Sequence, residues 1–447
     1  MRTSLILALA TWLILFSLTV QATEATGFKN GVDRNSYHPW QLTGWQAEPN
    51  WQQRIPGLVV SSPVIAGNTL LLASENGNLY AFDHQTKAIQ WIFPTGGALS
   101  STPTVHDNTV YQLSLDGHLY VINLSTGVEL WRFQTQGEQR FAGWGYLGIQ
   151  ADQPVTDPWD YFLSSPLVYD GLVYFGSSDQ HIYALDTDTG KVRWAFKTGG
   201  MVHSSPALAG DLVLVSSWDG ALYALDRHSG EEQWRFQTKT EQKLKVWLGI
   251  QSSPVVDGDN IYLGSRDGFL YAIDKDSGEK KWRYNAERSW IVGTPSFDGN
   301  NLYVGTSDTG WLLAIDKATG EERWRHRTYV WTFSSPLVFD GQVMIASIRG
   351  DLLLVDSNSG ELRQSYTTDT ATADRFQVLN KETGRFDYQS MVKNDWRHDN
   401  YALMQRILHN GGFLATPTVH HNQLYITTTD GELLRFNLHT AATQAND

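Results

Sequence analysis

Cysteine is absent from this chain of 447 residues. Its absence excludes disulfide bonds, thiolate metal sites and haem attachment through a C-x-x-C-H motif. It also excludes a lipid-bearing cysteine behind an export signal, so we expect a mature chain without a lipid anchor. A chain of this length can bury enough apolar surface to fold without disulfides.

Positive charge and catalytic motifs are scarce as well. The 34 Lys and Arg residues are outnumbered by 47 Asp and Glu residues, and the formal net charge is −13. This balance disfavours nucleic acid and anionic lipid as partners. No H-E-x-x-H, P-loop, dinucleotide-binding or Ser-His-Asp spacing occurs. We therefore predict no catalytic residue, no metal ligand and no bound cofactor.

Residues 1–22 have the pattern of a secretory signal. Arg2 precedes an apolar core from Ser4 to Val20, and a small-residue cleavage site ends at Ala22. The alternative is an uncleaved anchor, because the apolar run is close to the shortest membrane span. Cleavage predicts a periplasmic or secreted protein with no membrane insertion, beginning with an N-terminal extension at residues 23–47.

A unit of about 40 residues recurs along the chain, as in a β-propeller blade. Its most complete copy begins at Ser252-Ser253-Pro254 and ends at Trp282-Arg283-Tyr284. The prolines that open the units are Pro63, Pro103, Pro166, Pro206, Pro254, Pro295, Pro336 and Pro417. Each unit reads as four strands, A to D, with a hairpin-forming Asp-Gly between strands B and C. One Trp in strand D is expected to pack between blades.

The units predict an all-β, eight-bladed propeller over residues 48–437. The last unit offers no strand D, and residues 438–447 read as a disordered tail. Residues 49–55 resemble the missing strand and precede the first unit. The ring is therefore expected to close by pairing this N-terminal strand with the C-terminal blade, which leaves no open edge.

The Ala-x-Asp-x-x-(Ser/Thr)-Gly-x-x-x-Trp pattern, clearest at Ala224 to Trp234, resembles the pyrroloquinoline-quinone (PQQ)-type propeller repeat. The resemblance implies one of two branches. Quinoprotein dehydrogenases would bring PQQ with Ca²⁺, but they typically use a neighbouring-cysteine disulfide and are usually longer. The other branch looks like the propeller subunit of the outer-membrane β-barrel assembly machinery, a periplasmic scaffold that is normally a lipoprotein.

Three insertions interrupt the repeat, at residues 134–162, 239–249 and 366–412. Each follows a strand D, so all three are expected on one face, where insertions in repeat proteins often bind. The third contains a possible short helix around residues 400–408. The insertions are rich in aromatic residues, which either plug the axial channel or anchor a partner. The candidate partner-binding residues are Trp144, Tyr146, Trp159, Tyr161, Trp247, Trp396 and Tyr401.

Residues near the predicted axis differ between units. Converging Arg side chains there can hold a carboxylate or a peptide carbonyl, although a solvated turn is the simpler interpretation. The axial candidates are His203, Trp218, Arg266, Trp290, Trp331 and Arg349.

These observations favour an exported, non-enzymatic scaffold that binds a protein or peptide partner in the cell envelope, in the manner of outer-membrane assembly. We expect a monomer within a larger complex. The alternatives are a PQQ-dependent dehydrogenase and a glycan-binding propeller, because aromatic platforms also stack on sugars.

Overall fold

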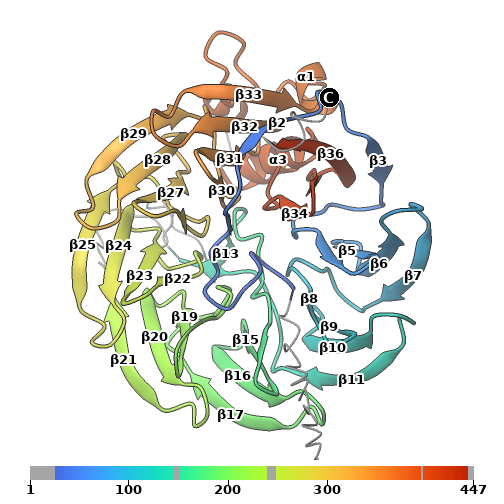
Figure 1. Ribbon diagram of the computed structural model, residues 1–447, viewed down its shortest axis with the longest axis vertical. Coiled ribbons are helices and arrows are strands. Elements are labelled where there is room, and N and C mark those ends of the chain that lie inside the picture. The colour runs from blue at the N-terminus through green and yellow to red at the C-terminus, as the bar shows by residue number, and fades with distance from the viewer. Residues whose placement is uncertain (1–25, 145–151, 239–247, 394–395, 441–447) are drawn as a thin grey trace, which may run out of the picture.

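The computed structural model describes residues 26–144, 152–238, 248–393 and 396–440. Eight sheets surround a central axis like blades, and the chain runs once around the ring (Figure 1). The predicted all-β, eight-bladed propeller is confirmed. No helix in the described ranges has both the length and the apolar character needed to cross a membrane.

Blades 1 to 4 each contain four antiparallel strands in chain order. Their strands are β4 (Val64–Ala66), β5 (Thr69–Ala73), β6 (Asn78–Asp83) and β7 (Ile89–Pro94); β8 (Thr104–His106), β9 (Thr109–Ser114), β10 (His118–Asn123) and β11 (Glu129–Gln134); β14 (Leu167–Tyr169), β15 (Leu172–Gly176), β16 (His181–Asp186) and β17 (Val192–Lys197); and β18 (Ala207–Ala209), β19 (Leu212–Ser216), β20 (Ala221–Asp226) and β21 (Glu232–Gln237).

Blades 5 to 8 repeat this order, and N-terminal strands join the last two. Their strands are β22 (Val255–Asp257), β23 (Asn260–Gly264), β24 (Phe269–Asp274) and β25 (Lys280–Asn285); β26 (Ser296–Phe297), β27 (Asn301–Gly305), β28 (Trp311–Asp316) and β29 (Glu322–Arg327); β30 (Leu337–Phe339), β31 (Gln342–Ala346), β32 (Asp351–Asp356) and β33 (Leu362–Thr367), with β1 (Tyr37–His38); and β34 (Thr418–His420), β35 (Gln423–Thr427) and β36 (Glu432–Thr440), with β2 (Leu42–Trp45) and β3 (Trp51–Arg54).

Blade 8 is completed from the N-terminus. Strand β3 pairs antiparallel with β36, with Trp51 opposite Arg435. It takes the strand D position that the sequence predicts for residues 49–55. The disordered tail predicted for residues 438–447 is wrong at its start, because β2 pairs with the end of β36 and orders the backbone there, with Trp45 opposite Leu438. Residues 441–447 lie outside the described ranges.

The Trp of strand D joins neighbouring blades, as the sequence predicts. The indole N–H of Trp194 donates to the carbonyl of Arg227 in the next blade at 2.9 Å. Gly230 faces the same ring with φ +74°, and a Cβ built on it would lie 2.6 Å from the indole. The glycine of the repeat therefore serves both the turn and this contact. The same type of donor bond recurs at Trp91, Trp131, Trp234, Trp282 and Trp324.

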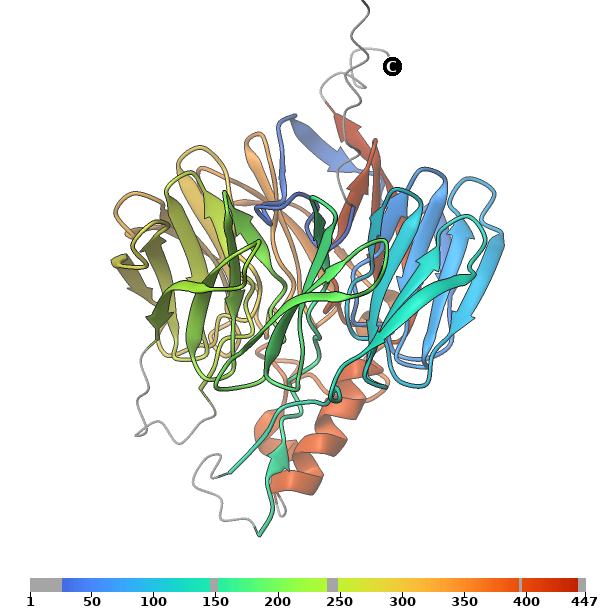
Figure 2. The same cartoon turned by 90° about the horizontal axis from the view of Figure 1, so that it is seen from below.

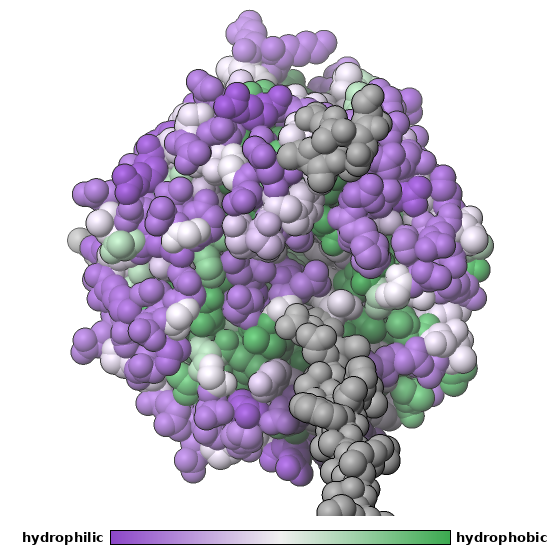
Figure 3. Space-filling model, viewed as in Figure 1, coloured by the Kyte–Doolittle hydropathy of each residue, from purple (hydrophilic) through white to green (hydrophobic). Residues whose placement is uncertain are grey.

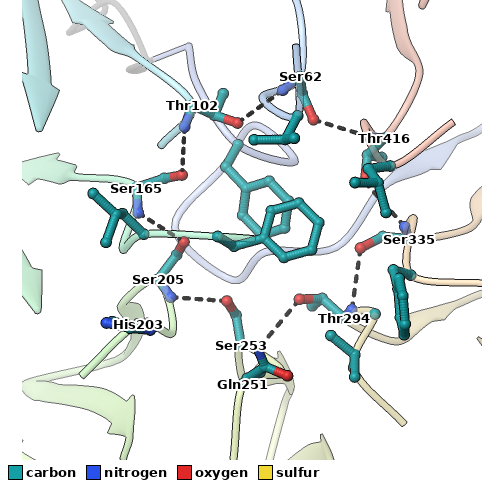
Figure 4. A pocket seen from close by; sticks show the side chains of 18 of the residues that line it. Ser62, Thr102, Ser165, His203, Ser205, Gln251, Ser253, Thr294, Ser335 and Thr416 are labelled. Carbon is teal, nitrogen blue, oxygen red and sulfur yellow. Dashed lines mark hydrogen bonds between the residues drawn. The ribbon is translucent and has the colours of Figure 1, made fainter. Parts of the chain in front are cut away.

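A second junction surrounds the axis, formed by the Ser or Thr that precedes each blade-opening proline (Figure 4). The backbone N–H of each residue donates to the side-chain oxygen of its counterpart in the next blade. Ser165, for example, donates to Ser205 at 3.0 Å. The circle of eight bonds runs through Ser62, Thr102, Ser165, Ser205, Ser253, Thr294, Ser335 and Thr416 and back to Ser62. This circle explains why a hydroxyl residue recurs before the proline.

Candidate functional site

The first and third insertions lie on one face of the ring (Figure 2). The first carries a short hairpin, β12 (Ala142–Gly143) paired with β13 (Val155–Thr156). The third carries α1 (Asp369–Ala373), α2 (Tyr388–Met391) and α3 (Trp396–Leu408). Helix α3 contains the predicted helical segment and begins four residues earlier. Residues 239–247 of the second insertion lie outside the described ranges.

Both insertions also pack into the axial end of the ring. The indole of Trp159 meets Trp290 edge-on at 6.0 Å between centroids, and Trp331 at 6.2 Å. The same apolar cluster includes Leu403 and Ile407 of α3. The insertions therefore share one apolar core with the axial end of the ring, which supports the interpretation that they plug the channel.

A buried ion pair anchors the first insertion to the ring. Nη1 of Arg266 donates to Oδ2 of Asp157 at 2.5 Å, and both side chains are fully buried. The guanidinium lies between two indoles, 4.4 Å from the centroid of Trp218 and 4.1 Å from that of Trp290. Nε donates to Gln251 at 2.6 Å. Burial raises the pKa of Asp157, while Arg266 opposes that rise. Arg266 does hold a carboxylate, but one supplied by its own chain.

A second buried network contains a Ser-His-Asp arrangement that no sequence spacing reveals. Nδ1 of His203 lies 3.0 Å from Oδ1 of Asp160, and Nε2 lies 2.9 Å from Oγ of Ser178. Burial lowers the pKa of His203, but the nearby carboxylates of Asp160 and Glu138 together outweigh burial, and the pKa is raised. The Ser178 hydroxyl has two acceptors besides the imidazole, Oε2 of Glu138 at 2.7 Å and the carbonyl of Gln139 at 2.9 Å.

This second network is enclosed by protein. Ser178 and His203 are each 3% exposed and Asp160 is 1% exposed. A nucleophile must reach its substrate, and this hydroxyl is sealed beneath the first insertion. The arrangement therefore ties the insertion to blades 3 and 4 and offers no access for hydrolytic chemistry.

The predicted partner-binding residues differ in exposure. Trp159 and Tyr161 are buried, at 6% and 2% exposure, and serve the plug. Tyr401 is half-buried and its hydroxyl donates to the carbonyl of Thr156. Trp144, beside β12, is 58% exposed. Tyr146, Trp247 and the side chain of Trp396 lie outside the described part of the structure.

The predicted axial residues lie near the packed insertions or the axis. His203, Trp218, Arg266 and Trp290 are buried around the two networks. Trp331 is half-buried against Phe386, 5.1 Å between ring centroids. The remaining candidate is Arg349, whose Nε lies 2.6 Å from Asp351.

Exposed aromatic side chains that the sequence analysis did not select also occur on this face. Tyr329, in the loop after β29, is 44% exposed and lies under the guanidinium of Arg349, 5.2 Å from ring centroid to Cζ. Phe376, after α1, is 39% exposed. The only feature of the sequence that could have indicated these two residues is their position in loops between blades.

The axial residues do not fit a quinone cofactor. The cavity inside the hydroxyl circle measures about 40 Å³ and is lined by Phe28 and Phe162 as well as polar side chains. Small-molecule sites usually measure about 300–1,000 Å³. The aromatic faces of Trp218 and Trp290 are taken by Arg266. Among the described residues, no group of three His, Asp or Glu side chains is placed to hold a metal.

Comparisons with known proteins bear on both branches of the resemblance. A family model described as outer membrane protein assembly factor BamB matches residues 40–145, 159–288 and 266–409. No curated protein sequence matches. The solved structure of BamB from Moraxella catarrhalis is 16% identical with a TM-score of 0.62, covering 87% of this chain and 99% of that one.

Quinoprotein structures are similar to a comparable degree. A europium-containing methanol dehydrogenase is 14% identical with a TM-score of 0.65, covering 92% of this chain and 97% of that one. Quinohemoprotein alcohol dehydrogenase from Comamonas testosteroni is 13% identical with a TM-score of 0.66, covering 92% and 80%. At such identities the likeness shows the propeller fold alone.

Proposed function

Because this chain belongs to the outer membrane protein assembly factor BamB family, we propose that it is a non-enzymatic scaffold that binds a protein partner during outer membrane protein assembly. The proposal places the protein in the periplasm, exported by residues 1–22. A rigid ring suits this role because it presents loops in fixed positions without reorganising on binding.

The binding surface is the insertion face. The observation that carries this assignment is the anchored hairpin of the first insertion, which holds Trp144 at 58% exposure beside β12. The Asp157–Arg266 pair fixes the base of this insertion. Large exposed aromatic side chains on a rigid support are typical anchors of protein interfaces. Tyr329 and Phe376 extend the surface over the neighbouring loops.

The alternative, a PQQ-dependent dehydrogenase, is less well supported. The fold is shared with such enzymes. However, the residues that would face a quinone are committed to the chain's own ion pair, and the axial cavity is too small. We infer that the protein works without this cofactor.

Site-specific photocrosslinking in the native envelope tests the proposal. A benzophenone amino acid replaces Trp144 in one variant and Tyr37 in the other; Tyr37 is an exposed aromatic residue on the opposite face, at 38% exposure. Crosslinks from position 144 to an outer-membrane assembly protein, with few from position 37, would support the proposal. Equal labelling of the assembly protein from both positions would contradict it, as would saturable PQQ binding by the purified protein.

A further inference from the structure

An N-terminal strap, residues 26–38, crosses the face opposite the insertions and binds the inner strands of the blades (Figure 1). Thr26 exchanges two backbone hydrogen bonds with Val105 of β8, at 2.9 and 2.7 Å. Further along, the carbonyl of Val32 accepts from the N–H of Leu208 in blade 4 at 2.8 Å. The strap accepts equivalent N–H bonds in blades 5, 6 and 7 from Val256, Phe297 and Val338.

All of these donors occupy one position, the second residue after the blade-opening proline. In blade 4, Leu208 lies opposite Val213, and its N–H points out of the ladder towards the strap. The equivalent residue of blade 3 is Val168, which lies opposite Val173 in the same register. Antiparallel ladders alternate bonded and non-bonded pairs, so the N–H of Val168 also points out of its sheet. The structure gives this N–H no acceptor among the described residues.

The strap backbone makes no hydrogen bond with β14 among the described residues, because it turns towards the axis there; the strap reaches blade 3 through the side chain of Arg34, whose Nη2 donates to the carbonyl of Pro166 at 3.4 Å. Lys29, Asn30 and Gly31 have positive φ values of 56°, 38° and 67°. Nζ of Lys29 is buried and donates to the carbonyls of Thr294 and Pro295 in blade 6. The strap thus bows away from β14 before it returns to blade 4 at Val32.

A groove of about 460 Å³ lies between the strap and β14. Its wall on the blade side is formed by Leu167, Val168 and Tyr169, and Asn30 and Val32 belong to the strap side. Tyr169 is 42% exposed at the rim. Figure 3 shows apolar side chains gathered over the inner parts of the lower blades on this face, inside a hydrophilic rim.

We propose that this groove binds an extended peptide segment of a client protein, which adds as a strand beside β14. The strap supplies the physical precedent: its backbone already accepts the equivalent N–H in blade 2, from Val105, and in blade 4, from Leu208, and in blade 7 its strand β1 pairs with β30. A client carbonyl accepts the N–H of Val168, and alternate aliphatic side chains face the apolar wall. The cavity beside the equivalent Val419 of blade 8 is smaller, about 90 Å³.

This second site lies on the face opposite the insertion surface and does not depend on the proposed scaffold role.

The test uses the full chain and a fluorescent, capped hexapeptide of alternating Thr and Val. The matched control peptide is N-methylated at its Val residues, which removes backbone donors and blocks strand addition. Binding is followed by fluorescence anisotropy, and the site by amide hydrogen exchange. We expect saturable binding of the first peptide only, with new protection at Val168 and none at Leu208, which the strap already engages.

Variants locate the site. Val168→Pro deletes the proposed donor and is expected to weaken binding about fivefold, the effect of one hydrogen bond. Val419→Pro makes the equivalent change in blade 8 and should leave binding unchanged. If Val168→Pro fails to fold, Tyr169→Glu replaces it, because a carboxylate at the rim disfavours an apolar peptide. Equal binding of both peptides, protection of Val168 before any peptide is added, or full binding by the Val168 or Tyr169 variant would overturn the proposal.

Discussion

Asp157 and Arg266 form an ion pair across 2.5 Å, although 109 positions separate them in the chain. The pair lies where an insertion meets the ring and contacts no solvent. The pair holds the insertion in place, and it places Arg266 against the indoles that a quinone would otherwise contact.

Removal of one partner of this pair should destabilise the protein strongly. Arg266→Met leaves the Asp157 carboxylate buried without its cation, which typically costs about 3–5 kcal/mol. The double variant with Asp157→Leu should lose less stability than the sum of the two single changes. Denaturant unfolding measures the free energies. Arg132→Met, at an exposed pair with Glu129, should have little effect. Additive single changes would show that the two residues are not coupled.

Stability should fall with rising pH through the titration of His203. Its folded pKa is raised above 6.5, so the protonated form is favoured by the folded state. The resulting stability is fully present below pH 6.5 and is lost as pH rises through the folded pKa. Unfolding free energies measured from pH 6 to 9 should show this decline in the wild type and a flatter profile for His203→Gln. The same slope in both proteins would exclude His203 as its source.

The hydroxyl circle should tolerate exchange of Ser for Thr but not loss of the hydroxyl. Ser165→Ala removes the acceptor of the Thr102 N–H, which stays buried, at a cost of about 1–3 kcal/mol. Ser253→Thr keeps the acceptor, as Thr294 does in the next blade. Thermal and denaturant unfolding compare the two variants. Equal losses would show that packing, not the hydrogen bond, decides stability here.

The contact between Gly230 and Trp194 can be separated from the backbone requirement of the turn. Gly230→Ala introduces a Cβ 2.6 Å from the indole at φ +74°. Gly210→Ala introduces one at φ +64° with nothing within 4 Å, so it measures backbone strain alone. We expect Gly230→Ala to be the more destabilising by at least about 1 kcal/mol. Equal unfolding midpoints would mean that the indole moves aside without cost.

The repeat was sufficient to predict the ring because its residues act locally. A turn Asp, a glycine with positive φ and a packed Trp each contact only their own or the next blade, as Trp194 and Gly230 do. A periodic sequence therefore predicts their contacts. The end of β36 was mispredicted because its partner, β2, is a strand beyond the four of the repeat unit.

The candidate site could be predicted only in outline. Loop positions and aromatic content indicated the insertion face, but they could not separate the buried Trp159 from the exposed Trp144. Contacts such as those between His203 and Asp160 join separate elements without a sequence period. The path of the strap could not be predicted either, because most of its hydrogen bonds use backbone atoms, which every residue has.

The hydroxyl circle has one more consequence. The N–H of Thr416 donates to Ser62 at 3.0 Å, so the last blade is joined to the first by the same bond as every other pair. Around the axis, the bonds do not distinguish the first blade from any other. Circular permutants whose new termini lie between different pairs of blades should therefore still form all eight bonds of the circle. A protein that lacks one whole unit would have to form a narrower circle. The geometry of the bonded circle thus favours a ring of eight blades.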